Sequence, residues 1–131
     1  MLTHVIWDWN GTLFDDISTG LLIINRMLVT RGRPPLADLA HYRRIFQFPV
    51  ENYYREAGLD FSKESFESMA ADYIALYPEV SRDCGLAEGA KEALAAFQAA
   101  GLHQHILSAS EQGLLESQLI KLGVRQYFDH V

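Results

Sequence analysis

Residues 5–16 read VIWDWNGTLFDD, and this stretch decides the fold that the sequence predicts. Its first residues belong to an apolar run within residues 3–9, and such a run is typical of a β-strand buried in a sheet. Asp8 follows where the strand passes into a turn that contains Gly11. We therefore expect the Asp8 carboxylate at the C-terminal edge of the sheet, where open α/β folds bind their ligands. A carboxylate held there against a cation or backbone N–H groups can act as a nucleophile.

The size and charge of the chain narrow the classes of protein to consider. Its 131 residues suffice for one hydrophobic core with a small additional lobe. Hydrophobic residues make up 49% and charged residues 21%, which is typical of a globular protein rather than a disordered one. The 17 acidic and 11 basic residues give a formal charge of −6, and no basic patch stands out. Binding to a nucleic-acid backbone is therefore not expected.

Cysteine usage and hydropathy indicate the cellular compartment. Cys84 is the only cysteine, which excludes an internal disulfide and suits a reducing environment. The N-terminus lacks the basic-then-apolar layout of a secretory signal. The longest apolar cluster, residues 20–24, is too short to span a bilayer. We expect a cytoplasmic protein without a membrane partner.

The first half of the chain is patterned as helices. Apolar residues at three-four spacing predict a helix over about residues 17–30, ended by Gly32 and the prolines that follow it. Of the shorter helices after it, one begins at Pro49 and a later one is predicted to have Ser62 as its cap and Pro78 as its end. The predicted core face of this later helix consists of Phe66, Met69, Ala70, Tyr73, Ile74 and Tyr77.

The second half alternates helices and strands. The pattern predicts a helix over 89–101, a strand over 103–107, a helix over 111–122 and the lead-in to another strand over 127–131. Such alternation indicates an α/β fold with a parallel sheet. The all-helical segment is inserted directly after the first strand.

The run DWNGTLFDD resembles the first signature of the haloacid dehalogenase-like superfamily, Asp-x-Asp-Gly-Thr-Leu-x-Asp. The stretch YRRIFQFPVENYYREAGLD (42–60) is similar to the cap of its phosphoglycolate-phosphatase-like members, and GLAEGAKEALAAFQAAG (85–101) resembles the helix that follows. The resemblance implies a Rossmann-like parallel sheet core, incomplete here, over residues 1–14 and 84–131. It implies an all-helical cap over residues 15–83.

Asp8 is the first site residue that the resemblance identifies. The matching Asp of the family attacks phosphorus and becomes a transient aspartyl phosphate, usually with Mg²⁺ as the cofactor. The resemblance therefore implies that Asp8 is both nucleophile and metal ligand. The alternative for an isolated residue is a strand-end Asp that only hydrogen-bonds the following turn.

Asn10 departs from the family signature, which has Asp at this position. In the family that Asp is the general acid and base, and its backbone carbonyl is a metal ligand. Asn10 can still supply the carbonyl, but its amide has no titratable proton, and loss of acid–base catalysis costs about two to four orders of magnitude in rate. Three explanations stay open: a natural variant with weaker or different chemistry, an inactivated form, or a non-catalytic relative.

The second family motif is an apolar strand that ends in Ser or Thr, and Ser108 in HILSAS matches it. The resemblance implies that Ser108 holds a phosphate oxygen, assisted by the backbone N–H of Ala109 and by the helix start near Glu111. Gly11 permits a tight turn with positive φ, and Thr12 can hydrogen-bond within it. Both are assigned to the phosphate-binding loop.

Other polar residues also have ordinary structural explanations. Arg43 and Arg44 could reach an anionic substrate from the cap, although paired helix arginines are more often a solvated face. Asp15 is interpreted as a helix-start carboxylate. His103 and His105 point the same way on a strand, and we interpret them as packing residues because no third metal ligand is evident.

The leading hypothesis is a Mg²⁺-dependent hydrolase of a small phosphorylated metabolite, a phosphate monoester. The alternative is a catalytically silent phosphate-binding or interaction protein on the same fold, or a fragment of an active enzyme, because only the first two of four family motifs are present. We expect weak turnover, if any, from this chain alone. We also expect self-association through the exposed edge of the first strand.

Overall fold

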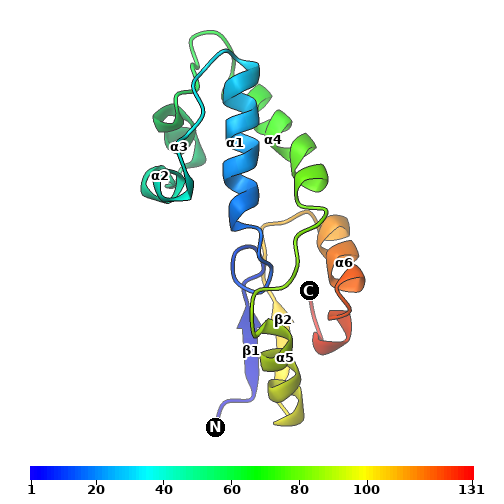
Figure 1. The fold of residues 1–131 in the computed structure, drawn as a ribbon. Helices are drawn as coiled ribbons and strands as arrows, with labels where there is room; N and C mark the ends of the chain where they lie inside the picture. The colour runs from blue at the N-terminus through cyan, green and yellow to red at the C-terminus, as the bar shows by residue number, and fades with distance from the viewer. The chain divides into compact units, whose positions relative to one another are not determined.

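A computed structural model describes residues 1–131. Backbone contacts divide the chain into two units, and Figure 1 colours the chain by residue number, so that the residues of each can be followed. The core unit comprises residues 1–16 and 84–131, and the helical unit comprises residues 17–83. Each unit has a hydrophobic core of its own, and the two cores share no residue.

The sheet of the core unit is parallel. Strand β1 (His4–Trp7) pairs with strand β2 (His103–Ile106), and Trp7 lies opposite Ile106. The C-terminal ends of both strands therefore meet at one edge of the sheet. This pairing confirms the predicted α/β class with a parallel sheet.

The chain returns to the sheet after β2 by way of α6 (Gln112–Lys121) and a short 3-10 helix (Arg125–Tyr127). The backbone N–H of Asp129 then donates to the carbonyl of Gln104 at 2.8 Å. Residues near the C-terminus thus lie beside β2 in the parallel sense. The predicted lead-in to a third strand is confirmed.

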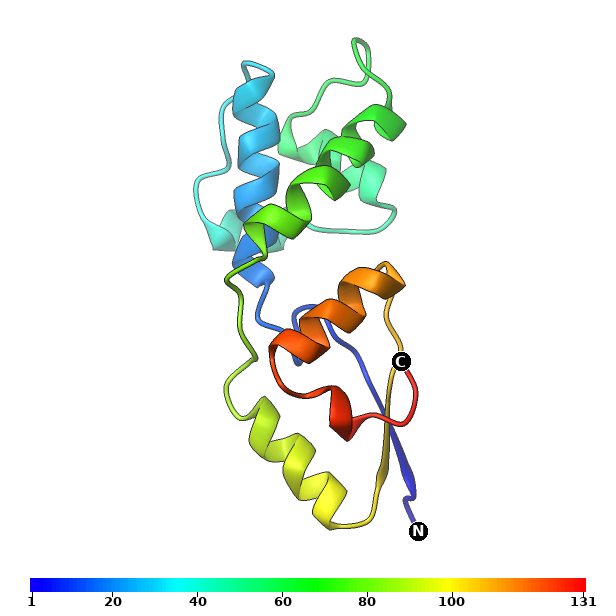
Figure 2. The ribbon, with the colours of Figure 1, turned by 90° about the vertical axis from the view of Figure 1, so that its right-hand side faces the viewer.

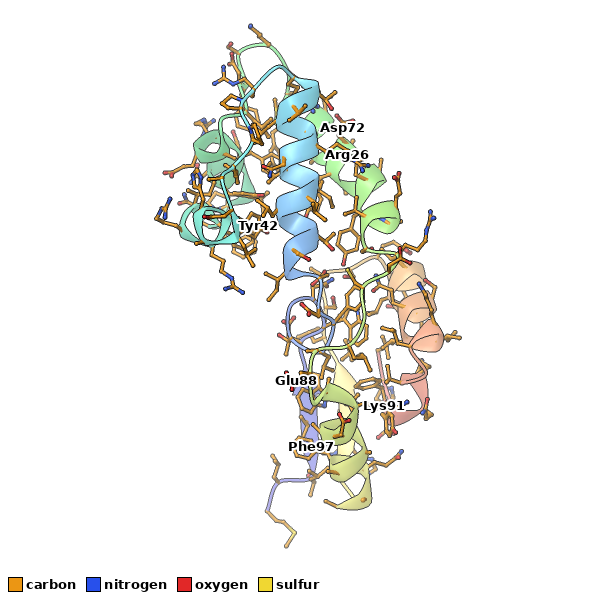
Figure 3. All side chains as sticks on the ribbon, in the orientation of Figure 1. Arg26, Tyr42, Asp72, Glu88, Lys91 and Phe97 are labelled. Carbon is orange, nitrogen blue, oxygen red and sulfur yellow. The ribbon has the colours of Figure 1, made fainter.

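Helices cover one face of the sheet. Helices α5 (Ala90–Ala99) and α6 lie on the same side of the strands (Figure 2), and their buried apolar residues pack in the core of this unit with Ile106 of β2 and with residues of the loop after β1. The buried amide of Gln104 is satisfied within it, because its Nε2 donates to the Leu94 carbonyl at 2.9 Å and its Oε1 accepts from Trp7 Nε1 at 3.0 Å. The Trp7 ring stacks on Phe97 of α5, labelled in Figure 3.

The opposite face of the sheet is open, which corrects the prediction of a buried first strand. Ile6 is 67% exposed and His4 is exposed, because no helix covers this side of β1. The strand is also shorter than the predicted residues 3–9. On the same face the rings of His103 and His105 stack against His4, with centroids 5.0 and 5.2 Å away, in agreement with the packing role expected for them.

The helical unit is built around α1 (Ile17–Thr30), which has the predicted bounds. In Figure 1 it lies between α4 (Phe66–Val80) on one side and the pair α2 (Leu39–Ile45) and α3 (Val50–Ala57) on the other. The buried hydrophobic residues of this unit are Ile23, Ile24, Met27, Leu28, Leu36, Ile45, Tyr53, Tyr54, Ala57, Leu59 and Met69.

The connection from α1 to α2 is held by side-chain hydrogen bonds. Gly32 ends α1 as predicted, with a φ of 69° that a residue with a side chain adopts only with strain. Asn25 of α1 then binds the backbone of Leu36 in both directions, accepting from its N–H at 2.7 Å and donating to its carbonyl at 3.3 Å.

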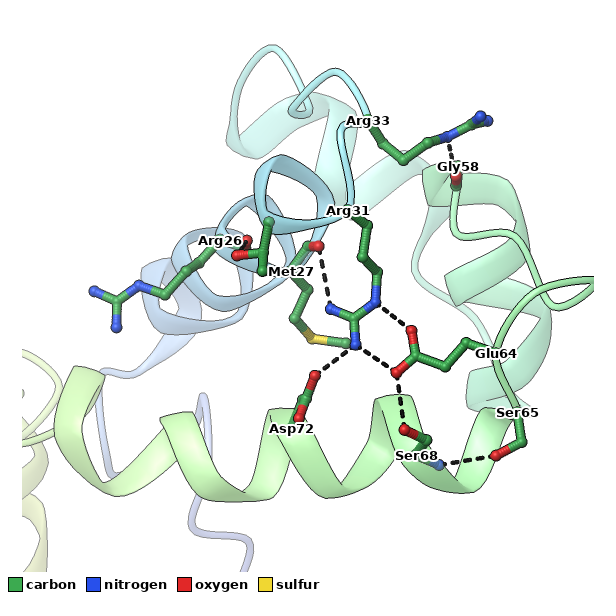
Figure 4. Close-up of polar contacts among 10 residues, drawn as sticks. Arg26, Met27, Arg31, Arg33, Gly58, Glu64, Ser65, Ser68 and Asp72 are labelled. Carbon is green, nitrogen blue, oxygen red and sulfur yellow. Dashed lines mark hydrogen bonds and ion pairs between the residues drawn. The ribbon is translucent and has the colours of Figure 1, made fainter.

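Arg31 joins the end of α1 to the start of α4 (Figure 4). Its guanidinium donates to both oxygens of Glu64, at 2.6 and 2.8 Å, and also to Asp72. The same group donates to the Met27 carbonyl at 3.2 Å. The hydrogen bonds from Arg31, and a further one from Ser68, lower the pKa of Glu64 to about 2.

The start of α4 differs from the prediction. Ser65, not Ser62, is the N-cap, and its hydroxyl accepts from the backbone N–H of Ser68 at 3.2 Å. Ser62 lies in the preceding turn, where its N–H donates to the Asp60 carboxylate at 2.9 Å. Both serines precede an apolar run at helical spacing, so the sequence pattern alone does not separate them.

The end of α4 also differs from the prediction. Pro78 lies inside the helix, which continues to Val80, and the N–H of Ser81 still donates to the Tyr77 carbonyl at 2.9 Å. Proline lacks an N–H, but the residues after it keep theirs and can still donate to carbonyls of the preceding turn. The helix can therefore continue for about half a turn beyond Pro78. Ile74, predicted on the core face, is 71% exposed.

Candidate active site

The loop after β1 turns tightly around one carbonyl group. The Trp9 carbonyl accepts from the backbone N–H groups of Thr12, Leu13 and Phe14 at 3.0–3.1 Å. Gly11 adopts a φ of 71°, in the left-handed region that favours glycine. The turn expected from the Gly-Thr pair is therefore present, and it brings the Thr12 hydroxyl back to the Asp8 carboxylate.

Buried contacts fix this loop to the core unit. The ring of Trp9 is fully buried and stacks on Phe14 with centroids 5.3 Å apart, and its Nε1 donates to Gln118 of α6 at 2.9 Å. The backbone of the loop pairs with the segment that returns from the helical unit, since the Asp15 N–H donates to the Gly85 carbonyl at 2.9 Å. The loop is thus held by α6 on one side and by the segment at Gly85 on the other.

Asp8 lies directly after β1 and is exposed. Its Oδ2 accepts a hydrogen bond of 2.7 Å from the Thr12 hydroxyl. Ser108 follows β2 closely, and because the strands are parallel both residues belong to the same edge of the sheet. A carboxylate in this setting keeps one oxygen in place through Thr12 and leaves its outer side open to solvent.

Asn10 connects the two strand ends. Its Oδ1 accepts from the Ser108 hydroxyl at 3.3 Å and from the Ser110 hydroxyl at 2.8 Å. The Ser108 hydroxyl in turn accepts from the backbone N–H of Ser110 at 3.1 Å. The structure therefore brings Asn10 and Ser108 together.

Two residues in this constellation were not predicted as site residues. Ser110 follows Ser108 in the same motif, and Asp16 directly follows Asp15, which alone is interpreted above as a helix-start carboxylate. Asp16 is buried, and its carboxylate accepts from Gly11 N–H at 2.7 Å and from Asn10 Nδ2 at 2.9 Å. The signal available for Asp16 was the doubled acid of residues 15–16, which the simpler helix-start interpretation accounted for.

The start of α6 corrects one expectation about anion binding. The Glu111 carboxylate caps this helix and accepts from the N–H groups of Gly113 and Leu114 at 2.8 and 2.7 Å. These backbone hydrogen bonds lower the pKa of Glu111 below its ordinary value. Two of the amides expected to face an anion are therefore already occupied by a carboxylate of the chain.

The remaining predicted residues make fewer contacts. Ala109 is exposed between the two serines. Arg43 and Arg44 are exposed in the last turn of α2, in the helical unit, and are not part of the hydrogen-bonded group in the core unit. No three His, Cys, Asp or Glu side chains converge in the way that metal ligands do.

The parallel sheet with an inserted helical unit, and an acidic residue at the end of its first strand, define a family of hydrolases. The chain belongs to the haloacid dehalogenase-like hydrolase family, whose family model matches residues 5–131. This confirms the resemblance carried by the first motif. A comparison with curated proteins gives no match.

Solved structures share this fold at low sequence identity. A haloacid dehalogenase-like family hydrolase from Streptococcus pneumoniae superposes with a TM-score of 0.78 at 16% identity, over 98% of this chain and 60% of that one. A subfamily IA hydrolase of the superfamily from Geobacter sulfurreducens gives 0.71 at 22% identity, over 99% and 61%. A predicted phosphoglycolate phosphatase from Haemophilus somnus gives 0.71 at 16% identity, over 98% and 61%. The chain thus spans about three fifths of these structures. None of its helices is long and apolar enough to cross a membrane.

Proposed function

We propose that this chain carries the nucleophile of a Mg²⁺-dependent phosphatase that acts on a small phosphate monoester. Asp8 attacks phosphorus and forms an aspartyl phosphate, and Ser108, Ala109, Gly11 and Thr12 surround the transferred group. The observation that carries the proposal is the exposed Asp8 carboxylate, oriented by the Thr12 hydroxyl at 2.7 Å, at the sheet edge where β2 delivers Ser108.

Mg²⁺ suits the donors at this edge. It prefers hard oxygen ligands, takes one or two carboxylates and keeps several waters. Asp8 offers an exposed carboxylate, and the backbone carbonyl of Asn10 is the second donor that we assign to the ion. When bound, the ion neutralises the negative charge of the phosphate and of Asp8.

We assign different roles to the two parts of the chain. Residues 1–14 and 84–131 form the catalytic core, and residues 15–83 form a cap that chooses the substrate. Arg43 and Arg44 are the cap residues that we assign to an anionic substrate, since both are exposed cations. A similar fold in a predicted phosphoglycolate phosphatase supports a small phosphorylated substrate, and we place the protein in the cytoplasm.

A second function is favoured by the hydrogen bonds of Asn10. Its side-chain amide donates to Asp16 and accepts from two serines. Because an amide has no titratable proton, it cannot act as the general acid for a leaving group. On this alternative the chain binds phosphate or a partner protein without turnover.

Beryllium fluoride distinguishes the two functions, because with Mg²⁺ it forms a mimic of the phosphoryl group on a nucleophilic aspartate. We expect a bound beryllofluoride signal in ¹⁹F NMR and a raised melting temperature in the wild-type chain. Both should require Mg²⁺ and disappear in Asp8→Asn. Asp15→Asn is the matched control, because Asp15 is an exposed carboxylate seven residues further along the loop. A signal that persists in Asp8→Asn, or none in the wild type, contradicts a nucleophilic Asp8.

A further inference from the structure

The carboxylate of Asp16 accepts two hydrogen bonds from the loop that follows β1. Asp16 immediately precedes α1 and is 8% exposed. Its Oδ1 accepts from the backbone N–H of Gly11 at 2.7 Å, and its Oδ2 accepts from Asn10 Nδ2 at 2.9 Å. An ionised carboxylate only accepts hydrogen bonds, so the group that faces Oδ2 has to be a donor.

The carbonyl oxygen of the Asn10 side chain faces hydrogen-bond donors, so the group at that position has to be an acceptor. Its Oδ1 faces the hydroxyls of Ser108 and Ser110, both of which donate to it. The amide therefore donates on one side and accepts on the other, and the carboxylate of Asp16 decides which way it is turned. Aspartate has the same shape but no N–H donor, and it cannot meet both requirements.

We infer that Asn10 and Asp16 form one coupled pair in which Asp16 is the positioning residue, and that position 10 requires an amide for as long as Asp16 is present. The meaning of this pair for catalysis rests on the proposed function. On that function, Asn10 is suited to the neighbouring Asp16, and its presence is more than the loss of the family's Asp at this position. Restoring the family's Asp at position 10 replaces the N–H that donates to Asp16 Oδ2 at 2.9 Å with an acceptor oxygen, so this hydrogen bond is lost and two acceptors face each other.

An exchange of the two residues provides the sharpest test. In Asn10→Asp/Asp16→Asn, the new amide at position 16 can accept from Gly11 N–H and donate to the new carboxylate at position 10. That carboxylate still accepts from both serines. These four hydrogen bonds are regained with the charge moved by one side chain, so the exchanged protein should unfold at nearly the same temperature as the wild type.

The experiment measures thermal unfolding of the wild type, both single variants and the exchanged variant in one buffer at neutral pH. For Asn10→Asp alone we expect a melting temperature about 5 °C or more below that of the wild type. The exchanged variant should recover most of that loss. General damage to the loop caused by a change at position 10 is not rescued by a second change at position 16.

Asn10→Asp/Asp15→Asn is the control, because it removes an equal charge from the adjacent residue. Asp15 is exposed, and no rescue is expected from it. A single Asn10→Asp variant with the wild-type melting temperature, or equal rescue by Asp15→Asn, overturns the inference. Unfolding is measured without Mg²⁺ or phosphate, so a failed beryllium fluoride experiment leaves this result unaffected, and the reverse also holds.

Discussion

An amide at position 10 has consequences for any phosphoryl transfer to Asp8. If Asp8 is the nucleophile that we propose, the lack of a titratable proton at position 10 favours esters whose leaving group is stable as an anion. We therefore predict that aryl and acyl phosphates are turned over in preference to alkyl phosphates, by about two orders of magnitude or more in kcat/KM. The measurement is a series of phosphate esters that differ in the pKa of the leaving group.

The exchanged variant Asn10→Asp/Asp16→Asn serves as the control for this series, since it introduces a titratable group at position 10. Its rates should depend less steeply on the leaving group than those of the wild type. Equal kcat/KM for aryl and alkyl esters in the wild type would mean that another residue donates the proton.

Gly20 is a second residue where a small change has a predictable effect. Glycine inside a helix normally costs about 1 kcal/mol relative to alanine, so Gly20→Ala in α1 would ordinarily stabilise. Here an added Cβ would lie 2.3 Å from the hydroxyl oxygen of Tyr42 and 2.8 Å from its ring carbon Cζ. Tyr42 is labelled in Figure 3 and packs edge-on against Tyr53. We expect Gly20→Ala to destabilise the helical unit by about 1–3 kcal/mol.

Chemical denaturation measures this change, with Gly85→Ala as a control because an added Cβ there meets no atom within 4 Å. In a Tyr42→Leu background, which lacks the ring, Gly20→Ala should no longer destabilise. A loss of the same size in that background would point to a cause other than the tyrosine.

At the scale of elements, the Arg31 network links the end of α1 to the start of α4 and makes the helical unit sensitive to acid. Glu64 has a folded pKa of about 2 against an ordinary 4.5, chiefly because Arg31 donates to it. A lowered carboxyl pKa stabilises the fold fully above the ordinary value and loses that effect as pH falls toward the folded value. We expect the stability of the helical unit to decline between about pH 4.5 and pH 2.

Unfolding monitored by tyrosine fluorescence across this pH range tests the expectation. Glu64→Gln should lower stability at neutral pH and reduce the slope below pH 4.5. Glu67→Gln, in the first turn of α4, is the matched control and should retain the slope. An unchanged acid slope in Glu64→Gln would exclude this carboxylate as the cause.

At the scale of the whole molecule, the open face and the outer edge of β1 favour association between copies. β1 pairs only with β2, and Ile6 and Leu107 on the open face are 67% and 74% exposed. Exposed strand edges pair readily with other chains, and a lysine on the edge strand opposes this. We predict concentration-dependent self-association, measured by sedimentation, that Ile6→Lys reduces. Ile74→Lys, which alters an equally exposed residue of α4, should leave it unchanged, and a monomer at all concentrations would contradict the prediction.

Much of the fold could be predicted because its signals are local. The periodicity of residues 17–30, the stop at Gly32 and the alternation after residue 89 depend on neighbours within a few positions. Where two local signals compete, as for Ser62 and Ser65 at the start of α4, the pattern does not choose between them. The exposure of β1 could not be predicted from its apolar sequence, because exposure depends on which faces of the sheet helices cover.

The first motif by itself determined the family and put Asp8 at a strand end, since a strand, a turn and the residues between them are encoded in consecutive positions. Only the tertiary structure decided how the amide of Asn10 is oriented. Its partner Ser110 lies 100 residues away, and Asp16 reaches it only after the loop has closed around the Trp9 carbonyl. Hydrogen bonds need donors and acceptors within about 3 Å, and that proximity arises from folding rather than from order along the chain.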